Sequence, residues 1–155
     1  MFQKNIGAEK ALQKIKQFCA YQERNHREVK EKLYSYGLYK KDVESIMAQL
    51  IEENFLNEER FAIAFAGGKF RINQWGRIKI KYELKQKGIS EYCIRMALRS
   101  IHESDYMKTL QQLLNEKSAS LKSEKNIFVK KQKLLRYLTQ KGFEANLIQQ
   151  FIHED

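Results

Sequence analysis

The sequence predicts an all-α protein made of three tandem three-helix repeats that form an elongated, curved stack. The 155 residues include no proline and only seven glycines, which disfavours a turn-rich β fold. Helix-forming residues such as Leu, Ala, Glu, Lys and Gln dominate nearly every window. One pattern of apolar residues also occurs three times, which indicates a chain of small repeated units rather than one ordinary domain.

The repeat is clearest when positions are counted from Gly37, Gly88 and Gly142, which are 51 and 54 residues apart. Apolar residues occupy five positions relative to each glycine: Leu33, Leu84 and Leu138 four before; Val29, Ile80 and Leu134 eight before; Leu38, Ile89 and Phe143 one after; Val43, Ile94 and Ile148 six after; Met47, Leu98 and Ile152 ten after. The pattern indicates a unit of about 50 residues: a lead helix, a helix that ends at glycine and a closing helix. We place the three repeats at residues 1–54, 55–102 and 103–155.

The first repeat begins with a helix over residues 8–21, where apolar side chains recur at helical spacing. Asn25 and Glu28 form a capping-box pattern and predict the start of the second helix, which ends at Gly37. A third helix is expected over residues 42–54.

In the second repeat, Asn57 is expected to cap the lead helix. Glu58 and Glu59 lie in its first turn, where the helix dipole favours acidic side chains. The pair Gly67 and Gly68 is expected to weaken this helix.

The central helix of the second repeat is expected to begin near Trp75 and Gly76. It ends at Gly88, at the position where a left-handed residue closes a helix. Ser90 is then a good cap for the closing helix over residues 91–101.

In the third repeat, Ser104 is expected to cap the lead helix, and residues 118–126 are polar enough to predict a loop. Residues 130–141 correspond to the central helix and residues 144–153 to the closing helix. A three-helix unit has little core of its own, so neighbouring repeats are expected to bury each other's faces.

The charge of the chain suggests a polyanionic or acidic partner, because its net charge is +10 and its pI is about 9.5. Residues 69–87 carry seven cations against one glutamate, and so do residues 122–141. The alternative is that these lysines keep a long stack in solution. The candidate contacts to DNA or a protein partner are Arg77, Lys79, Lys81, Lys85, Lys87, Lys130, Lys131, Lys133 and Arg136.

An acidic stretch over residues 42–59 contrasts with these basic segments. It is either ordinary helix-start and surface charge or a docking face, for which Glu58, Glu59 and Arg60 are the candidates. The single tryptophan, Trp75, either docks a partner or stacks on a base, or it packs at a junction between units.

The sequence contains no recognisable catalytic, metal or cofactor motif. It has neither a phosphate-binding loop nor an HExxH pair, and its three histidines are scattered. Cys19 and Cys93 lack metal-ligand spacing and are expected to be buried thiols in a reducing interior. There is no apolar run of the ~20 residues that a membrane span needs. The first residues lack the apolar core of a signal peptide. We therefore expect a cytoplasmic, monomeric, non-enzymatic protein without metal or cofactor.

Three segments resemble the RecX family, the regulators of the RecA recombinase. Residues 23–37 read ERNHREVKEKLYSYG, residues 54–66 read NFLNEERFAIAFA and residues 76–89 read GRIKIKYELKQKGI. The last of these is similar to the family's G-x-x-x-I-x-x-E-L-x-x-K-G-I core, and the third repeat matches by internal repetition. Asn25 stands where serine is common and Asn57 where aspartate is common. Both substitutions keep a cap, and the second removes a charge.

The resemblance implies binding to RecA, chiefly as its filament on single-stranded DNA, within DNA recombination, repair and the SOS response. Family members lie in the filament's helical groove, limit its extension and restrain strand exchange and ATP hydrolysis. Two other hypotheses remain at this point. One is a helix-turn-helix-like transcription regulator, which would bind specific duplex DNA, usually as a two-fold dimer. The other is a purely structural adaptor.

Overall fold

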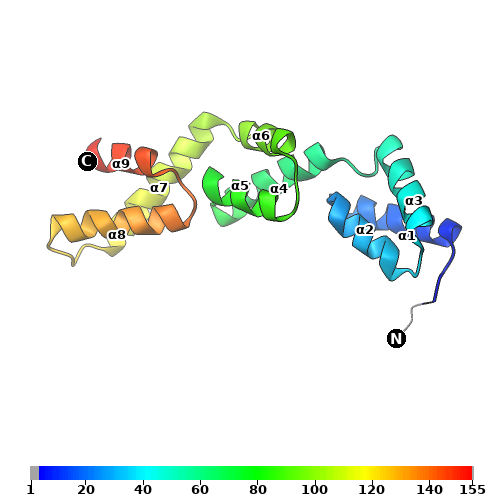
Figure 1. Ribbon diagram of the computed structural model, residues 1–155. Coiled ribbons are helices and arrows are strands. Elements are labelled where there is room, and N and C mark those ends of the chain that lie inside the picture. Colours follow the sequence, from blue (N-terminus) through cyan, green and yellow to red (C-terminus); the bar gives the residue numbers. More distant parts are fainter. Residues whose placement is uncertain (1–3, 155) are drawn as a thin grey trace.

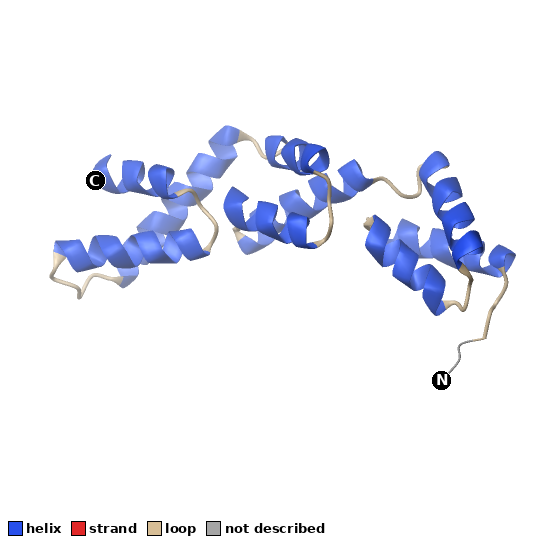
Figure 2. Cartoon of the chain, in the orientation of Figure 1, coloured by secondary structure: helices blue, strands red, loops and turns tan. Residues whose placement is uncertain are grey.

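A computed structural model describes residues 4–154, and this part of the chain contains nine helices and no strand (Figures 1 and 2). The helices are α1 (Ala8–Tyr21), α2 (His26–Ser35), α3 (Lys40–Glu52), α4 (Glu58–Asn73), α5 (Arg77–Gln86), α6 (Glu91–Arg99), α7 (Glu103–Ser120), α8 (Ile127–Gln140) and α9 (Ala145–Glu154). They form three successive triplets along an elongated molecule, with the first triplet at one end and the third at the other (Figure 1). The predicted fold class is confirmed.

The three central helices α2, α5 and α8 end at the glycines that define the repeat, and each glycine has a positive φ: 84° at Gly37, 78° at Gly88 and 100° at Gly142. Asn25 caps α2 through the expected capping box with Glu28, because each side chain accepts a hydrogen bond from the other residue's backbone N–H. The glycines therefore mark where these three helices stop, and the capping box marks where α2 starts.

The lead helix of the second repeat is not interrupted at its glycine pair, contrary to expectation. Helix α4 continues through Gly67 and Gly68 to Asn73. Gly67 is buried, and the guanidinium group of Arg71 fills the space that a β-carbon would take there. Packing against the rest of the repeat thus outweighs the low helix propensity of the glycine pair.

Two expectations for the third repeat were wrong. His102, not Ser104, is at the N-cap of α7, which begins at Glu103. The expected loop over residues 118–126 is shorter, because α7 extends to Ser120. Helix α8 begins at Ile127, where the side chain of Asn126 accepts a hydrogen bond from the N–H of Val129.

The described residues form two separate hydrophobic cores. One is formed by α1–α3 and the connection that follows α3, and it includes Ile15, Leu33 and Leu56. The other is continuous through the second and third repeats, from Phe61 to Ile152. The expectation that neighbours share a core therefore holds for the second and third repeats, but not for the first and second.

The central helices follow one another head to tail in one row, in the order α8, α5, α2 (Figure 1). Where α8 meets α5, the N–H of Gly76 donates to the carbonyl of Lys141 at 2.8 Å. Where α5 meets α2, the guanidinium of Arg27 donates to the carbonyl of Gln86 at 2.9 Å. The basic segments of the sequence thus lie along one extended row.

Candidate partner interface along the central helices

The lysines of α5 lie on two opposite flanks of this helix. Ile80 is fully buried and marks the inward face. At about 100° per residue, Lys81 and Lys85 fall on one side of it and Lys79 on the other, while Lys87, the C-cap residue, falls close to the direction of Ile80 on the Lys79 side. The first two are exposed, whereas Lys79 and Lys87 are half-buried. The candidate cations of α5 therefore form two surfaces instead of one.

Arg77 lies at the seam between the second and third repeats, and its charge is used within the protein. Its guanidinium pairs with Glu103 and with Glu144, the latter at 2.8 Å, and it lies 3.7 Å from the ring centre of Tyr106. Only 21% of the Arg77 side chain is exposed. Arg77 therefore joins the two repeats and offers little charge to a partner.

The hydroxyl of Tyr106 completes this seam. It donates a hydrogen bond to Glu144 and accepts one from the backbone N–H of Arg77 at 3.0 Å. Burial raises the pKa of Tyr106, and the hydrogen bond to Glu144 raises that pKa further. The neutral phenol is thus the form that the folded protein holds.

The cations of α8 are spread around the helix. Lys133 pairs with Glu124, with 3.2 Å between its ammonium nitrogen and the carboxylate. The hydrogen bond from the backbone N–H of Asn126 lowers the pKa of Glu124, and the hydrogen bond from Lys133 lowers that pKa further. Lys130 and Lys131 line a hollow formed by residues of α7, α8 and α9. These cations therefore do not share one face.

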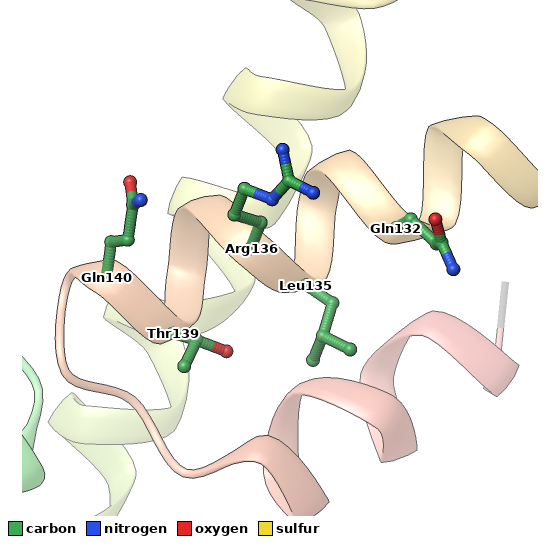
Figure 3. A pocket seen from close by; sticks show the side chains of 5 residues that line it. All are labelled: Gln132, Leu135, Arg136, Thr139 and Gln140. Atoms are coloured by element: carbon green, nitrogen blue, oxygen red, sulfur yellow. The ribbon is translucent and has the colours of Figure 1, made fainter.

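Arg136 lies beside a shallow hollow on α8, which is also lined by Gln132, Leu135, Thr139 and Gln140. In Figure 3, Leu135 points toward α9, whereas Arg136 points away from it. Arg136 is exposed, as is Lys131, and neither forms an ion pair within the described chain, so both of these α8 cations are open to a partner.

The three candidates from the acidic stretch also differ in whether their charged groups form contacts within the protein. Glu58 accepts a hydrogen bond from the N–H of Ser90 at 3.1 Å, and Arg60 pairs with Glu23 of the first repeat. Glu59 is half-buried and makes no side-chain hydrogen bond or ion pair with the described residues. Two of the three therefore hold the protein's own structure together.

A cluster on the Lys79 side of α5, here called the aromatic–lysine patch, consists of Phe65, Lys69, Trp75, Lys79 and Lys87. Phe65 and Trp75 meet edge to face, with their centres 6.5 Å apart. Sequence reasoning singled out Trp75 but missed Phe65 and Lys69 as its neighbours. The available signal was their i, i+4 spacing, which the expected weakening at Gly67 and Gly68 concealed.

The comparisons with known proteins agree with this architecture. Residues 57–98 match the family model described as the second three-helix domain of RecX, and residues 103–152 match that of its third. The chain belongs to the RecX family.

Relatives in the RecX family cover most of this chain. A regulatory protein RecX from Clostridium perfringens (strain 13) is 33% identical over 78% of the chain, and one from Bacillus cytotoxicus is 26% identical over 97%. The chain spans little more than half the length of these two relatives, 57% and 55%. The regulatory protein RecX of Prosthecochloris aestuarii is 28% identical over 94% of the chain and 93% of its own length.

Solved RecX structures share the fold. The crystal structure of RecX from Lactobacillus salivarius matches with a TM-score of 0.85 at 25% identity, over 95% of both chains. A second crystal structure of a regulatory protein RecX matches with a TM-score of 0.83 at 22% identity, over 96% of this chain and 72% of its own. The tandem three-helix architecture is thus that of the RecX family.

Cys19 and Cys93 are buried free thiols, and burial raises the pKa of Cys19. Over residues 4–154, His, Cys, Asp and Glu side chains form no cluster of three that could hold a metal ion. None of the helices in the same span combines the length and apolar character that a membrane crossing requires.

Proposed function

We propose that this protein is a non-enzymatic regulator that binds the RecA filament on single-stranded DNA and restrains its ATP hydrolysis and strand exchange. Membership of a family of regulatory proteins supports the proposal. The observation that carries it is the head-to-tail row of α8, α5 and α2, because an extended row suits a long, repetitive partner. The proposal places the protein in the cytoplasm and has it act as a monomer.

The contact surface in this proposal is narrower than the set of basic residues in the sequence. Arg77 and Lys133 are paired within the protein. The exposed cations without an ion pair in the described chain are therefore the principal contacts to the filament: Lys81, Lys85, Lys131 and Arg136. Because these positions lie on successive helices of one row, several units of a polymer can be contacted at once.

The test is the ATPase activity of RecA from the same organism, assembled on single-stranded DNA and titrated with this protein. A regulator that acts along or at the end of a filament inhibits well below one protein per RecA monomer. A lack of effect at excess protein, with the protein folded and the filament confirmed, contradicts the proposal. A footprint on a specific duplex sequence would instead indicate a transcription regulator.

A further inference from the structure

We propose that the aromatic–lysine patch binds single-stranded nucleic acid directly, with Trp75 stacking on a base and the neighbouring lysines contacting phosphates. The inference deepens the proposed function, on which it rests for placing this flank of α5 against the DNA of the filament rather than its protein. The opposite flank, with Lys81 and Lys85, is not part of this site.

The backbone brings Trp75 onto α4. The helix closes at Gln74, a residue with a left-handed φ of 57°, and the N–H of Trp75 then donates to the carbonyl of Lys69 at 3.1 Å. This turn returns the indole toward the preceding helix, where its ring and that of Phe65 lie at an interplanar angle of 70°. Trp75 is half-buried and packs against the hydrophobic core, so its position is well defined.

Lysine ammonium groups surround these two rings. Lys69 lies 4.9 Å from the centre of the Trp75 ring and 5.6 Å from that of Phe65. Lys79 lies 4.5 Å from the Trp75 ring, and Lys87 lies 5.4 Å from that of Phe65. The three cations come from α4, α5 and the C-cap of α5, and the aromatic pair holds them in one place.

One carboxylate, Glu83, lies one helical turn from both Lys79 and Lys87, but it forms no ion pair with either of them, so the patch keeps an excess of positive charge. Lys69, Lys79 and Lys87 make no ion pair within the described chain, whereas Lys133 pairs with Glu124. A further cation, Lys141, is fixed nearby, because its ammonium donates to the carbonyl of Asn73 at the end of α4. Such a concentration of like charge is stabilised when phosphate groups approach it.

The mixture of rings and cations favours nucleic acid over an acidic protein surface. A carboxylate can pair with each lysine, but it offers no aromatic ring that can stack on an indole or phenyl face. Every nucleobase has such a face, and surfaces that bind single strands combine aromatic stacking with a positively charged track. In a duplex the faces of the bases are already stacked, so a single strand is the expected ligand.

The sole tryptophan makes the patch its own reporter, because all tryptophan emission of this protein comes from Trp75. We expect oligothymidylate, added without RecA, to quench this emission in a saturable way. The double variant Lys69→Gln, Lys79→Gln removes two proposed phosphate contacts. It should weaken binding roughly tenfold or more at moderate salt. The plot of log K against log salt has a negative slope, which should become shallower by about 1.4.

The matched control is Lys10→Gln, Lys41→Gln, which removes the same charge from exposed positions of the first repeat. It should bind within about threefold of the unmodified protein, since only diffuse attraction is lost. Trp75→Phe, followed by anisotropy of a labelled oligonucleotide, should also weaken binding while circular dichroism shows an unchanged helical content.

Three results would overturn the inference: unchanged Trp75 emission with oligothymidylate, an equal loss of affinity in the test and control variants, or quenching by oligoglutamate as strong as by the oligonucleotide. The RecA ATPase titration separates this inference from the proposed function. Inhibition without oligonucleotide binding removes only the patch assignment, whereas binding without inhibition removes the proposed filament regulator.

Discussion

Gly76 and Gly142 lie backbone against backbone at the seam between the second and third repeats. The N–H of Gly76 donates to the carbonyl of Lys141 at 2.8 Å, and the N–H of Ile78 donates to the carbonyl of Gly142 at 2.9 Å. A β-carbon on Gly76 would overlap the carbonyl group of Gly142. The end of α8 can therefore meet the start of α5 only because both positions lack a side chain.

Gly76→Ala is expected to lower the free energy of unfolding by about 1–3 kcal/mol, because the new methyl group forces apart two hydrogen-bonded segments. Denaturant unfolding followed by circular dichroism measures this change. Gly68→Ala is the control, since its β-carbon would meet nothing within 4 Å and its helix propensity rises. It should be neutral or stabilising, and equal losses in both variants would contradict the role given to the seam.

Tyr106→Phe is expected to cost about 1–3 kcal/mol at neutral pH, because the fully buried hydroxyl serves both Glu144 and the N–H of Arg77. The ring itself is kept, so its packing against Phe70 and Phe143 is retained. Chemical denaturation of both proteins in one buffer measures the difference.

The stability difference between the unmodified protein and Tyr106→Phe should also depend on pH. The pKa of Tyr106 lies above the ordinary tyrosine value of 10.0, so the folded state holds a proton that the unfolded state releases. This contribution to stability is complete below pH 10 and falls as the pH rises further, by at most about 1.4 kcal/mol per pH unit. Tyr106→Phe lacks this loss, so the gap between the two proteins should narrow above pH 10. A gap that stays constant would contradict a raised pKa.

The two cores predict unfolding in two stages. Leu33 belongs to the first core and Leu138 to the second, and both are fully buried. Each change to alanine should cost about 2–5 kcal/mol, but only in its own core. Residue-resolved hydrogen exchange should therefore show faster opening of the first repeat in Leu33→Ala and of the second and third repeats in Leu138→Ala. Equal acceleration throughout the chain in either variant would mean that the protein unfolds as one unit.

The sequence was sufficient for the fold because apolar periodicity and end signals act locally. Leu33, Leu84 and Leu138 are all fully buried, as their matching positions before the three glycines predict. Helix limits were less certain where packing outweighs propensity, as at Gly67. The N-cap at His102 was missed because no side-chain hydrogen bond marks it.

The candidate interface was less predictable, because periodicity gives the side of a helix but not its neighbour. Arg77 appeared in the sequence as one more cation of α5, yet it pairs with Glu144 across the seam. No spacing rule connects these two residues, since they meet only through the head-to-tail contact of α5 and α8. The same holds for Phe65 on α4 and Lys87, the C-cap residue of α5, which meet only through the packing of the repeat.

The exposed flank of α5 gives the most direct test of the proposed filament contact. Lys81→Glu combined with Lys85→Glu reverses two charges at exposed positions, so the core beneath them, including Ile80, is not disturbed. Because the proposed partner surface is anionic, the concentration needed for half-inhibition of the RecA ATPase should rise about tenfold or more. This corresponds to a loss of at least about 1.4 kcal/mol in binding. Lys10→Glu combined with Lys41→Glu is the control of equal charge, and it should change this concentration by less than about threefold. Unchanged inhibition by the α5 variant, with helical content intact, would move the contact away from this flank.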